Sequence, residues 1–349
     1  MIVMRWRAGL VLSIDDAWRG AVALTARLDP PIGDDPPSVA ALAYVPLVGT
    51  PQVGDRVLLN LNALTLGLGT GGYAFVVALP DRLPPDSPLP RHGLVKARYT
   101  PHQVVTPAPP AVPDQLDGLP AVTADLHSAL PAIIAGITAG QPDARIAYVV
   151  TDGGALPLWF SRSLATLRAR LAVVVTTGQA FGGDIEAVNI HSGLLAARGA
   201  GATIAVVAPG PGNLGTATAW GFSGTSVGEA INAIATLGGR PVGALRLSFA
   251  DPRPRHRGIS HHSLTAYGRV ALALADLVLP ALPAPLLATV TPQLTSLTGR
   301  HRVVTIDATT LDPVLRSLEL STMGRGFEAD PWYFRSAAVA GAHAASLIP

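Results

Sequence analysis

The 349-residue sequence contains no cysteine, and this absence excludes several kinds of chemistry. A thiol nucleophile, a disulfide framework, a thiolate zinc site and an iron–sulfur cluster all require cysteine. Lysine is nearly absent as well, since Lys96 is the only one in the chain. The sequence therefore has no GK[ST] phosphate loop, and a lysine Schiff base would have to use Lys96.

Charged residues are also few, at 14% of the chain, whereas apolar residues make up 49%. This apolar fraction is ample for a core and excludes disorder over most of the chain. The formal net charge of +2 gives no general reason to expect a nucleic-acid or membrane surface. A chain of this length is expected to form a major domain and a smaller one.

One stretch, residues 270–290, has the length of a membrane span, but it contains Asp276 and three prolines. We interpret it as a buried strand, a proline-broken connection and a helix. The first twenty residues lack the apolar run and the cleavage site of a signal peptide. We therefore expect a cytoplasmic protein. Its expected partner is a small-molecule ligand, not nucleic acid or membrane. The sequence leaves open whether the protein forms a homo-oligomer.

Residues 1–80 have the period-two alternation and turn signals of a small β domain. The expected strands are 21–28, 39–45, 56–61 and 73–79. They predict a compact, antiparallel, β-barrel-like domain. Within it, LGLGTGG (66–72) could be a phosphate loop, but a strand follows it instead of a helix. We therefore favour a hairpin or bulge there.

Proline and polar residues dominate residues 81–120, which we expect to be a linker whose middle, 93–105, pairs with one of the domains. Strands and helices alternate from residue 121 to 349. The expected strands are 121–126, 145–151, 172–177, 203–208 and 242–249, and the expected helices are 130–138, 158–170, 185–197 and 227–237. This alternation predicts an α/β domain with a mainly parallel, helix-covered sheet in a Rossmann-like three-layer arrangement.

The segments that follow these strands are rich in glycine and polar side chains. They are LHS (126–128), TDGGALP (151–157), TTGQAFGGDIE (176–186), APGPGNLGT (208–216) and FADPRPRHRG (249–258). In a parallel sheet all five lie on one edge, which is where open α/β sheets usually bind ligands. Glycines there let backbone amides approach a ligand, although ordinary turn and cap chemistry explains part of the composition.

Groups that bind anions are concentrated in these turns. Guanidinium groups hold phosphate or carboxylate in bidentate geometry, and backbone amides of a glycine loop add further donors. Solvated surface charge is the alternative interpretation of the arginines. The expected ligand-binding residues are Asp152, Gly210, Gly212, Gly215, Asp251, Arg253, Arg255, His256 and Arg257.

The loop GPGNLG (210–215) has the spacing of a dinucleotide-binding turn. Two features oppose that interpretation, because no amphipathic helix opens directly after the loop and Asp251 lies too far along the chain for a ribose contact. A dinucleotide-binding oxidoreductase is therefore the weaker alternative. A serine nucleophile at Ser223 in GFSGT is weaker still, since the G-x-S-x-G spacing fails.

Histidines and carboxylates in or near the same turns predict an acid–base or metal centre. The candidate catalytic residues are Asp184, Glu186, His261 and His262, which would bind a divalent metal or shift each other's pKa. Alternatively, Asp184 and Glu186 cap and support a helix that begins near residue 185. His127 and His191 are further candidates. Because no HExxH motif occurs, no particular metal or cofactor is predicted.

Four long runs carry a resemblance to a known family. They are LNLNALTLGLGTGGYAFVVA, YVVTDGGALPL, TTGQAFGGDIEAVNIHSGLLAAR and the run from APGPGNLGT to GISHHSLTA. Over nearly the whole chain the sequence resembles the bacterial family catalogued as domain of unknown function 3866. The resemblance implies no activity and no catalytic residues.

Two hypotheses of function follow from the residues. The first is a hydrolase, or another acid–base or metal-assisted enzyme, that acts on a small anionic metabolite. The second is a non-catalytic protein that binds a metabolite or takes part in an assembly. They differ in whether acidic and imidazole groups converge on one point, as catalysis requires.

Overall fold

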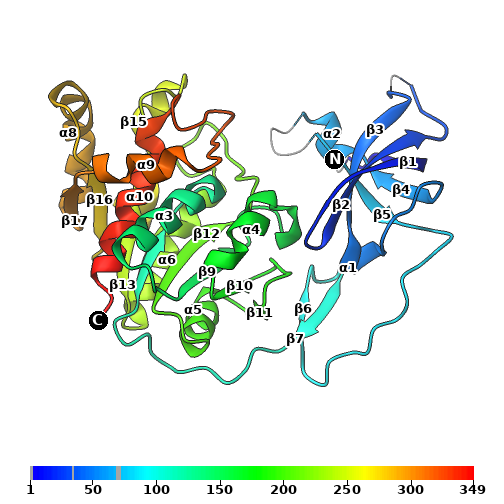
Figure 1. Ribbon diagram of the computed structural model, residues 1–349, viewed down its shortest axis with the longest axis horizontal. Coiled ribbons are helices and arrows are strands. Elements are labelled where there is room, and N and C mark those ends of the chain that lie inside the picture. Colours follow the sequence, from blue (N-terminus) through cyan, green and yellow to red (C-terminus); the bar gives the residue numbers. More distant parts are fainter. Residues whose placement is uncertain (1–2, 34, 68–71) are drawn as a thin grey trace. The chain divides into compact units, whose positions relative to one another are not determined.

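The computed structural model describes residues 3–33, 35–67 and 72–349 (Figure 1). The chain divides into two compact units. The first comprises Met1–Leu89 with Trp159–Ala165, and the second comprises Pro90–Leu158 with Thr166–Pro349. Residues 68–71, which make up most of the LGLGTGG segment, lie outside the described residues.

The first unit is a closed five-stranded barrel, which confirms the predicted β domain. Its strand order is β1-β2-β3-β5-β4, with the bounds β1 Trp6–Trp18, β2 Ala21–Leu28, β3 Ser38–Tyr44, β4 Arg56–Asn60 and β5 Ala74–Ala78. Inward side chains such as Leu24, Leu59 and Val76 form its core. The pairing is antiparallel except between β3 and β5, and two one-turn helices, α1 Val45–Val48 and α2 Asn62–Thr65, interrupt the strands.

The sequence pattern missed the longest strand of this barrel, β1. Register shifts occur between Val11 and Ser13 and between Ile14 and Asp16, where β1 pairs with β2. Each shift moves the following side chains to the opposite face, so the alternation that identifies a strand is lost.

The second unit is built on an eight-stranded sheet, and every pair of neighbouring strands in it is parallel. The order is β11-β10-β9-β12-β8-β13-β16-β17, with the bounds β11 Ile185–Glu186, β10 Val173–Thr176, β9 Ile146–Thr151, β12 Ile204–Pro209, β8 Pro120–Thr123, β13 Arg240–Ala244, β16 Asp276–Pro280 and β17 Arg302–Ile306. The central strands are buried along their whole length, as expected of strands covered on both faces. The predicted α/β fold is confirmed.

Helices cover this sheet in the predicted three-layer arrangement. Helices α5 (Ile190–Gly199) and α6 (Ser226–Thr236) share one apolar core with the sheet. Helices α3 (Leu130–Gly140) and α10 (Pro331–Ser346) pack against each other and against the sheet (Figure 1). Their contact is very close, since a Cβ atom added at Gly136 would lie 1.9 Å from the carbonyl oxygen of Ala338.

Three predicted elements differ from the structure. Residues 185–197 do not form one helix: β11 comes first, and α5 begins only after Asn189, whose side chain caps it. The helix expected over 158–170 is reduced to α4 (Arg162–Leu167) between two 3₁₀ turns. The strand expected over 242–249 ends at Ala244, and β14 (Leu247–Ser248) pairs with β15 (Gly258–Ile259) outside the main sheet.

Residues 270–290 contain the strand, the connection and the start of the helix that the sequence predicted. Strand β16 precedes a proline-rich connection and α8 (Ala284–Thr298). Over the described ranges, no helix combines the length and the apolar character that crossing a membrane requires. The remaining elements are the hairpin β6 (Gly93–Lys96) and β7 (Val104–Pro107) and the short helices α7 (His261–Thr265) and α9 (Asp312–Arg316).

Candidate functional site

The five polar turns lie at the carboxyl edge of the sheet because β8, β9, β10, β12 and β13 all run in the same direction. Beyond the end of β13, the hairpin of β14 and β15 carries the segment ADPRPRHR at its tip. The side chain of Gln293 on α8 holds this hairpin by accepting from the amide of Ile259 and donating to the carbonyl of Arg257. The hairpin therefore presents its polar tip from a fixed base.

Three histidines meet directly after this hairpin. Ser260 begins α7, because its hydroxyl accepts a hydrogen bond from the amide of His262. The first turn of the helix thus places His261 and His262 beside His256 from the hairpin tip. One ring nitrogen from each of the three histidines lies within 4.8 Å of one from each of the others.

Each ring of this histidine cluster has a defined neighbour. Nδ1 of His256 lies 2.7 Å from the hydroxyl of Ser260. The ring of His262 stacks on Phe222, with centroids 3.9 Å apart and an interplanar angle of 2°. Nε2 of His261 is buried and has no hydrogen-bond partner among the described residues.

Asp125, just after β8, stands behind this cluster. Its Oδ2 lies 3.5 Å from Nδ1 of His262 and 3.7 Å from a guanidinium nitrogen of Arg246. Burial alone would raise the pKa of Asp125, but the close contact with His262 and the positive charge of Arg246 hold it below its usual value. The carboxylate is therefore ionised although it is buried.

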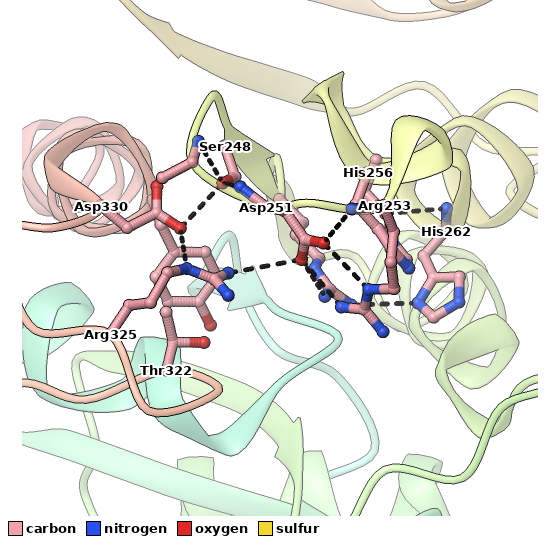
Figure 2. Close-up of polar contacts among 12 residues, drawn as sticks. Ser248, Asp251, Arg253, His256, His262, Thr322, Arg325 and Asp330 are labelled. Atoms are coloured by element: carbon pink, nitrogen blue, oxygen red, sulfur yellow. Dashed lines mark hydrogen bonds and ion pairs between the residues drawn. The ribbon is translucent and has the colours of Figure 1, made fainter.

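A network of ion pairs connects the hairpin tip to the loop before α10 (Figure 2). Arg253 binds both carboxylate oxygens of Asp251, at 2.9 and 2.8 Å. Arg325 lies between two carboxylates, 3.3 Å from Asp251 and 3.1 Å from Asp330. The hydroxyl of Ser248 donates to Asp330 at 2.8 Å.

The charges of this network balance. Burial alone would raise the pKa of Asp251, but the guanidinium of Arg253 holds it well below its usual range. Arg246 also reaches Asp251, at 3.8 Å. The guanidiniums of Arg246, Arg253 and Arg325 thus face the carboxylates of Asp125, Asp251 and Asp330. The network holds the hairpin tip in place without a net charge of its own.

A cavity of about 110 Å³ opens beside the histidine cluster. Guanidinium and imidazole groups and part of the loop GPGNLG line it. The lining residues are Leu126, Asn213, Leu214, Gly215, Thr216, Arg246, Arg253, Arg255, His256, His262 and Met323. Among the described residues, Arg255 has no carboxylate partner, in contrast to Arg246 and Arg253.

The environment keeps two of the histidines neutral. Burial, together with the positive charges of Arg246 and Arg253, lowers the pKa of His256 to about 3. Burial and the neighbouring His262 and Arg255 lower the pKa of His261 to about 4. Both rings therefore present a lone pair at neutral pH, which suits a metal ligand.

The glycines of GPGNLG have different roles. A Cβ atom at Gly210 would lie 2.8 Å from the carbonyl oxygen of Ala155, so this glycine allows the turns after β9 and β12 to touch. Gly212 has a φ of 90°, which favours glycine. Only Gly215 lines the cavity. No helix begins until the 3₁₀ turn at Ser223, which is unlike a dinucleotide-binding loop.

The structure places Asp184 and Glu186 at the β11 edge of the sheet, whereas His261 and His262 belong to α7. Asp184 directly precedes β11, and Glu186 is the last residue of this strand. Three strands lie between β11 and β8, so these two strands are about 19 Å apart at the usual strand spacing. Asp184 binds the amide of Val174 and the guanidinium of Arg168. It does not cap a helix.

Glu186 is a structural residue. It accepts from the hydroxyl of Thr176 and the amide of Gly182, and its carboxylate lies 3.4 Å from Nζ of Lys96. Lys96 is 1% exposed and also donates to the carbonyl groups of Ala180 and Ala187. Burial lowers the pKa of Lys96, and the charge of Glu186 partly restores it. The ammonium group anchors β6 to the turn after β10 and does not line the cavity.

Four other predicted residues do not line the cavity. Asp152 is exposed and accepts from the amide of Gln179. The side chain of Arg257 is exposed and does not line the cavity, although its neighbour Arg255 does. His191 is exposed on α5. His127 is buried at the sheet edge, with Nδ1 3.0 Å from the hydroxyl of Tyr148.

Sequence reasoning missed Asp125 and Arg246. Asp125 comes one residue before the turn LHS and was included in a strand that ends in fact at Thr123. Arg246 was included in the strand 242–249, where it is the only charged residue. A lone charge in an apolar strand is a usable signal, because a buried charge needs a partner.

Comparisons with known proteins give one match. A family model described as a protein of unknown function (DUF3866) matches residues 40–341. Neither the curated proteins nor the solved structures contain a match. The matched range includes the histidine cluster and every residue that lines the cavity. Because the model covers far more than half of the chain, this protein belongs to the DUF3866 family of proteins of unknown function.

Proposed function

We propose that the protein is an enzyme that binds a small phosphate- or carboxylate-bearing metabolite in the cavity at the carboxyl edge of the sheet. The observation that carries this proposal is Arg255, whose guanidinium lines the cavity without a carboxylate partner among the described residues. Arg246 and Arg253 are paired with Asp125 and Asp251, so Arg255 supplies the positive charge that an incoming anion would balance.

The size of the cavity suits a single anionic group. A cavity of about 110 Å³ has room for several water molecules, and therefore for a phosphate or carboxylate group. Gly215 and Thr216 also line the cavity, where backbone amide groups can add donors.

The histidine cluster favours catalysis over binding alone. His256 and His262 line the same cavity as Arg255, so an anion held by the guanidinium lies beside imidazole nitrogens. Imidazole groups next to a bound substrate supply proton transfer or hold a metal ion. A site for binding alone has no need of three converging histidines.

Phosphate affinity measured by titration calorimetry tests the anion site. We expect Arg255→Ala to weaken the binding of inorganic phosphate by roughly 10- to 100-fold, because one charge-assisted hydrogen bond contributes about 1.5–3 kcal/mol. Arg257→Ala is the matched control, since its side chain is exposed, lies two residues away and does not line the cavity. Equal affinity in Arg255→Ala and the unaltered protein would contradict the proposal.

A second measurement separates an enzyme from a binding protein. Phosphate monoesters and carboxylate esters are assayed for product release with the unaltered protein and with His261→Ala. Turnover that is lost in His261→Ala while phosphate binding persists supports the enzyme. Esters that bind in an Arg255-dependent manner without turnover favour the non-catalytic metabolite-binding protein.

A further inference from the structure

The three histidines of the cluster have the geometry of a metal site. One nitrogen from each lies within 4.8 Å of the others, and the ring centroids of His261 and His262 are 4.4 Å apart. In a tetrahedral zinc site with Zn–N distances of 2.0–2.1 Å, the nitrogens are about 3.3 Å apart. Closure around an ion therefore requires ring movements of about an ångström.

The hydrogen bonds leave one ring nitrogen of each histidine available. Nδ1 of His256 faces the hydroxyl of Ser260, and Nδ1 of His262 faces Asp125. Nε2 is therefore the available nitrogen of both rings. In His262 this nitrogen is directed toward the GPGNLG loop, since a Cβ atom at Gly215 would lie 3.8 Å from it.

Two buried atoms at this place lack hydrogen-bond partners among the described residues. They are Nε2 of His261 and Oδ2 of Asp125. Leaving such a group unsatisfied costs about 1–3 kcal/mol. Oδ2 of Asp125 has the charged neighbours Arg246 and His262, so the orphaned Nε2 of His261 is the atom that indicates a ligand. An ion bound by Nε2 of His261 satisfies this atom.

The guanidinium of Arg246 does not block the site. Arg246 lies 3.3 Å from Nδ1 of His262, on the side opposite to the free Nε2. Its charge is shared between Asp125 and Asp251. A cation on the Nε2 side of His262 therefore faces away from the guanidinium of Arg246.

We infer that His256, His261 and His262 bind one divalent transition-metal ion through imidazole nitrogens, with Asp125 orienting His262. Zinc is the best match, because a site with three histidines leaves its fourth position open in catalytic zinc proteins. Since His256 and His262 line the cavity, the open position faces the proposed anion site. The role of the ion in turnover rests on the proposed function, whereas metal binding itself does not.

The test uses the full-length protein after treatment with a chelator and dialysis. Zinc affinity and stoichiometry are measured by titration calorimetry and by elemental analysis of the refilled protein. We expect one ion per chain, and a loss of affinity of about 100-fold or more in His261→Ala, which exceeds the effect of losing an outer partner. His191→Ala, which removes an exposed histidine of α5, should bind zinc as the unaltered protein does.

The variants are checked for folding by circular dichroism and thermal melting. His262→Gln is the second variant, because it keeps a polar side chain at a buried position. The inference is overturned if the unaltered protein binds no zinc, or if folded His261→Ala and His262→Gln bind it as tightly as His191→Ala. Phosphate binding without zinc binding would contradict this inference alone, and zinc binding without phosphate binding would contradict only the proposed function.

Discussion

Oδ2 of Asp125 lies 3.5 Å from Nδ1 of His262, so a carboxylate from the end of β8 stands behind an imidazole from the first turn of α7. The two residues are far apart in sequence, and the parallel sheet brings them together at one edge. A carboxylate in this position orients the imidazole from the Nδ1 side and leaves Nε2 to a ligand.

Asp125→Asn should weaken zinc binding by roughly 10- to 100-fold without changing its stoichiometry. The amide keeps the shape of the side chain but removes the charge that orients His262. Titration calorimetry with zinc measures the change. If affinity is unchanged in a folded Asp125→Asn protein, the carboxylate serves only to balance the charge of Arg246.

Lys96→Met should lower the free energy of unfolding by about 3–5 kcal/mol, because it leaves the buried carboxylate of Glu186 without its cation. Urea denaturation followed by circular dichroism measures the loss. The double variant Lys96→Met, Glu186→Gln should be less destabilised than the sum of the two single variants. Strictly additive losses would show that the pair is not coupled.

Gly154→Ala should destabilise the fold by roughly 1–3 kcal/mol. The added Cβ would lie 2.2 Å from the carbonyl oxygen of Gly210, and backbone cannot rotate away as a side chain can. Gly153→Ala is the neighbouring control, since its nearest atom is 3.4 Å away. The two variants are compared by urea denaturation, and similar losses would argue against the tight contact between these turns.

The stability of the protein should fall as the pH decreases from about 6.5 to about 4, and His127 is one cause. Burial lowers the pKa of His127 from 6.5 to about 4 in the folded state. Between these values the unfolded chain binds the proton and the folded chain does not, so protons favour unfolding. Below pH 4 both states are protonated, and the full effect is about 3 kcal/mol.

The pH dependence is checked by measuring the free energy of unfolding of His127→Gln at pH 7 and pH 4.5. This variant should lose about 2 kcal/mol less than the unaltered protein over that interval. His191→Gln, which removes an exposed imidazole, is the control. The same loss in His127→Gln as in the unaltered protein would exclude His127 as a cause.

Much of the fold could be predicted because it depends on local patterns. The buried run IAYVVT and its parallel neighbours are continuous apolar segments between turns, and their spacing identifies an α/β sheet. The predicted boundaries of helices and strands were wrong where long-range strand pairing overrode the local sequence pattern. Ile185 and Glu186 were assigned to a helix, yet they pair with Val175 and Thr176 as an edge strand. Nothing local distinguishes those two outcomes.

The sequence by itself determined which chemistry is available: no cysteine, one lysine, and a run of arginines and histidines after a strand of a parallel sheet. Only the tertiary structure decided which of these residues meet. The order of strands places β8 beside β13, so Asp125 joins His262, whereas Glu186 in β11 pairs with Lys96 instead. Strand order depends on long-range packing, and no local pattern records it.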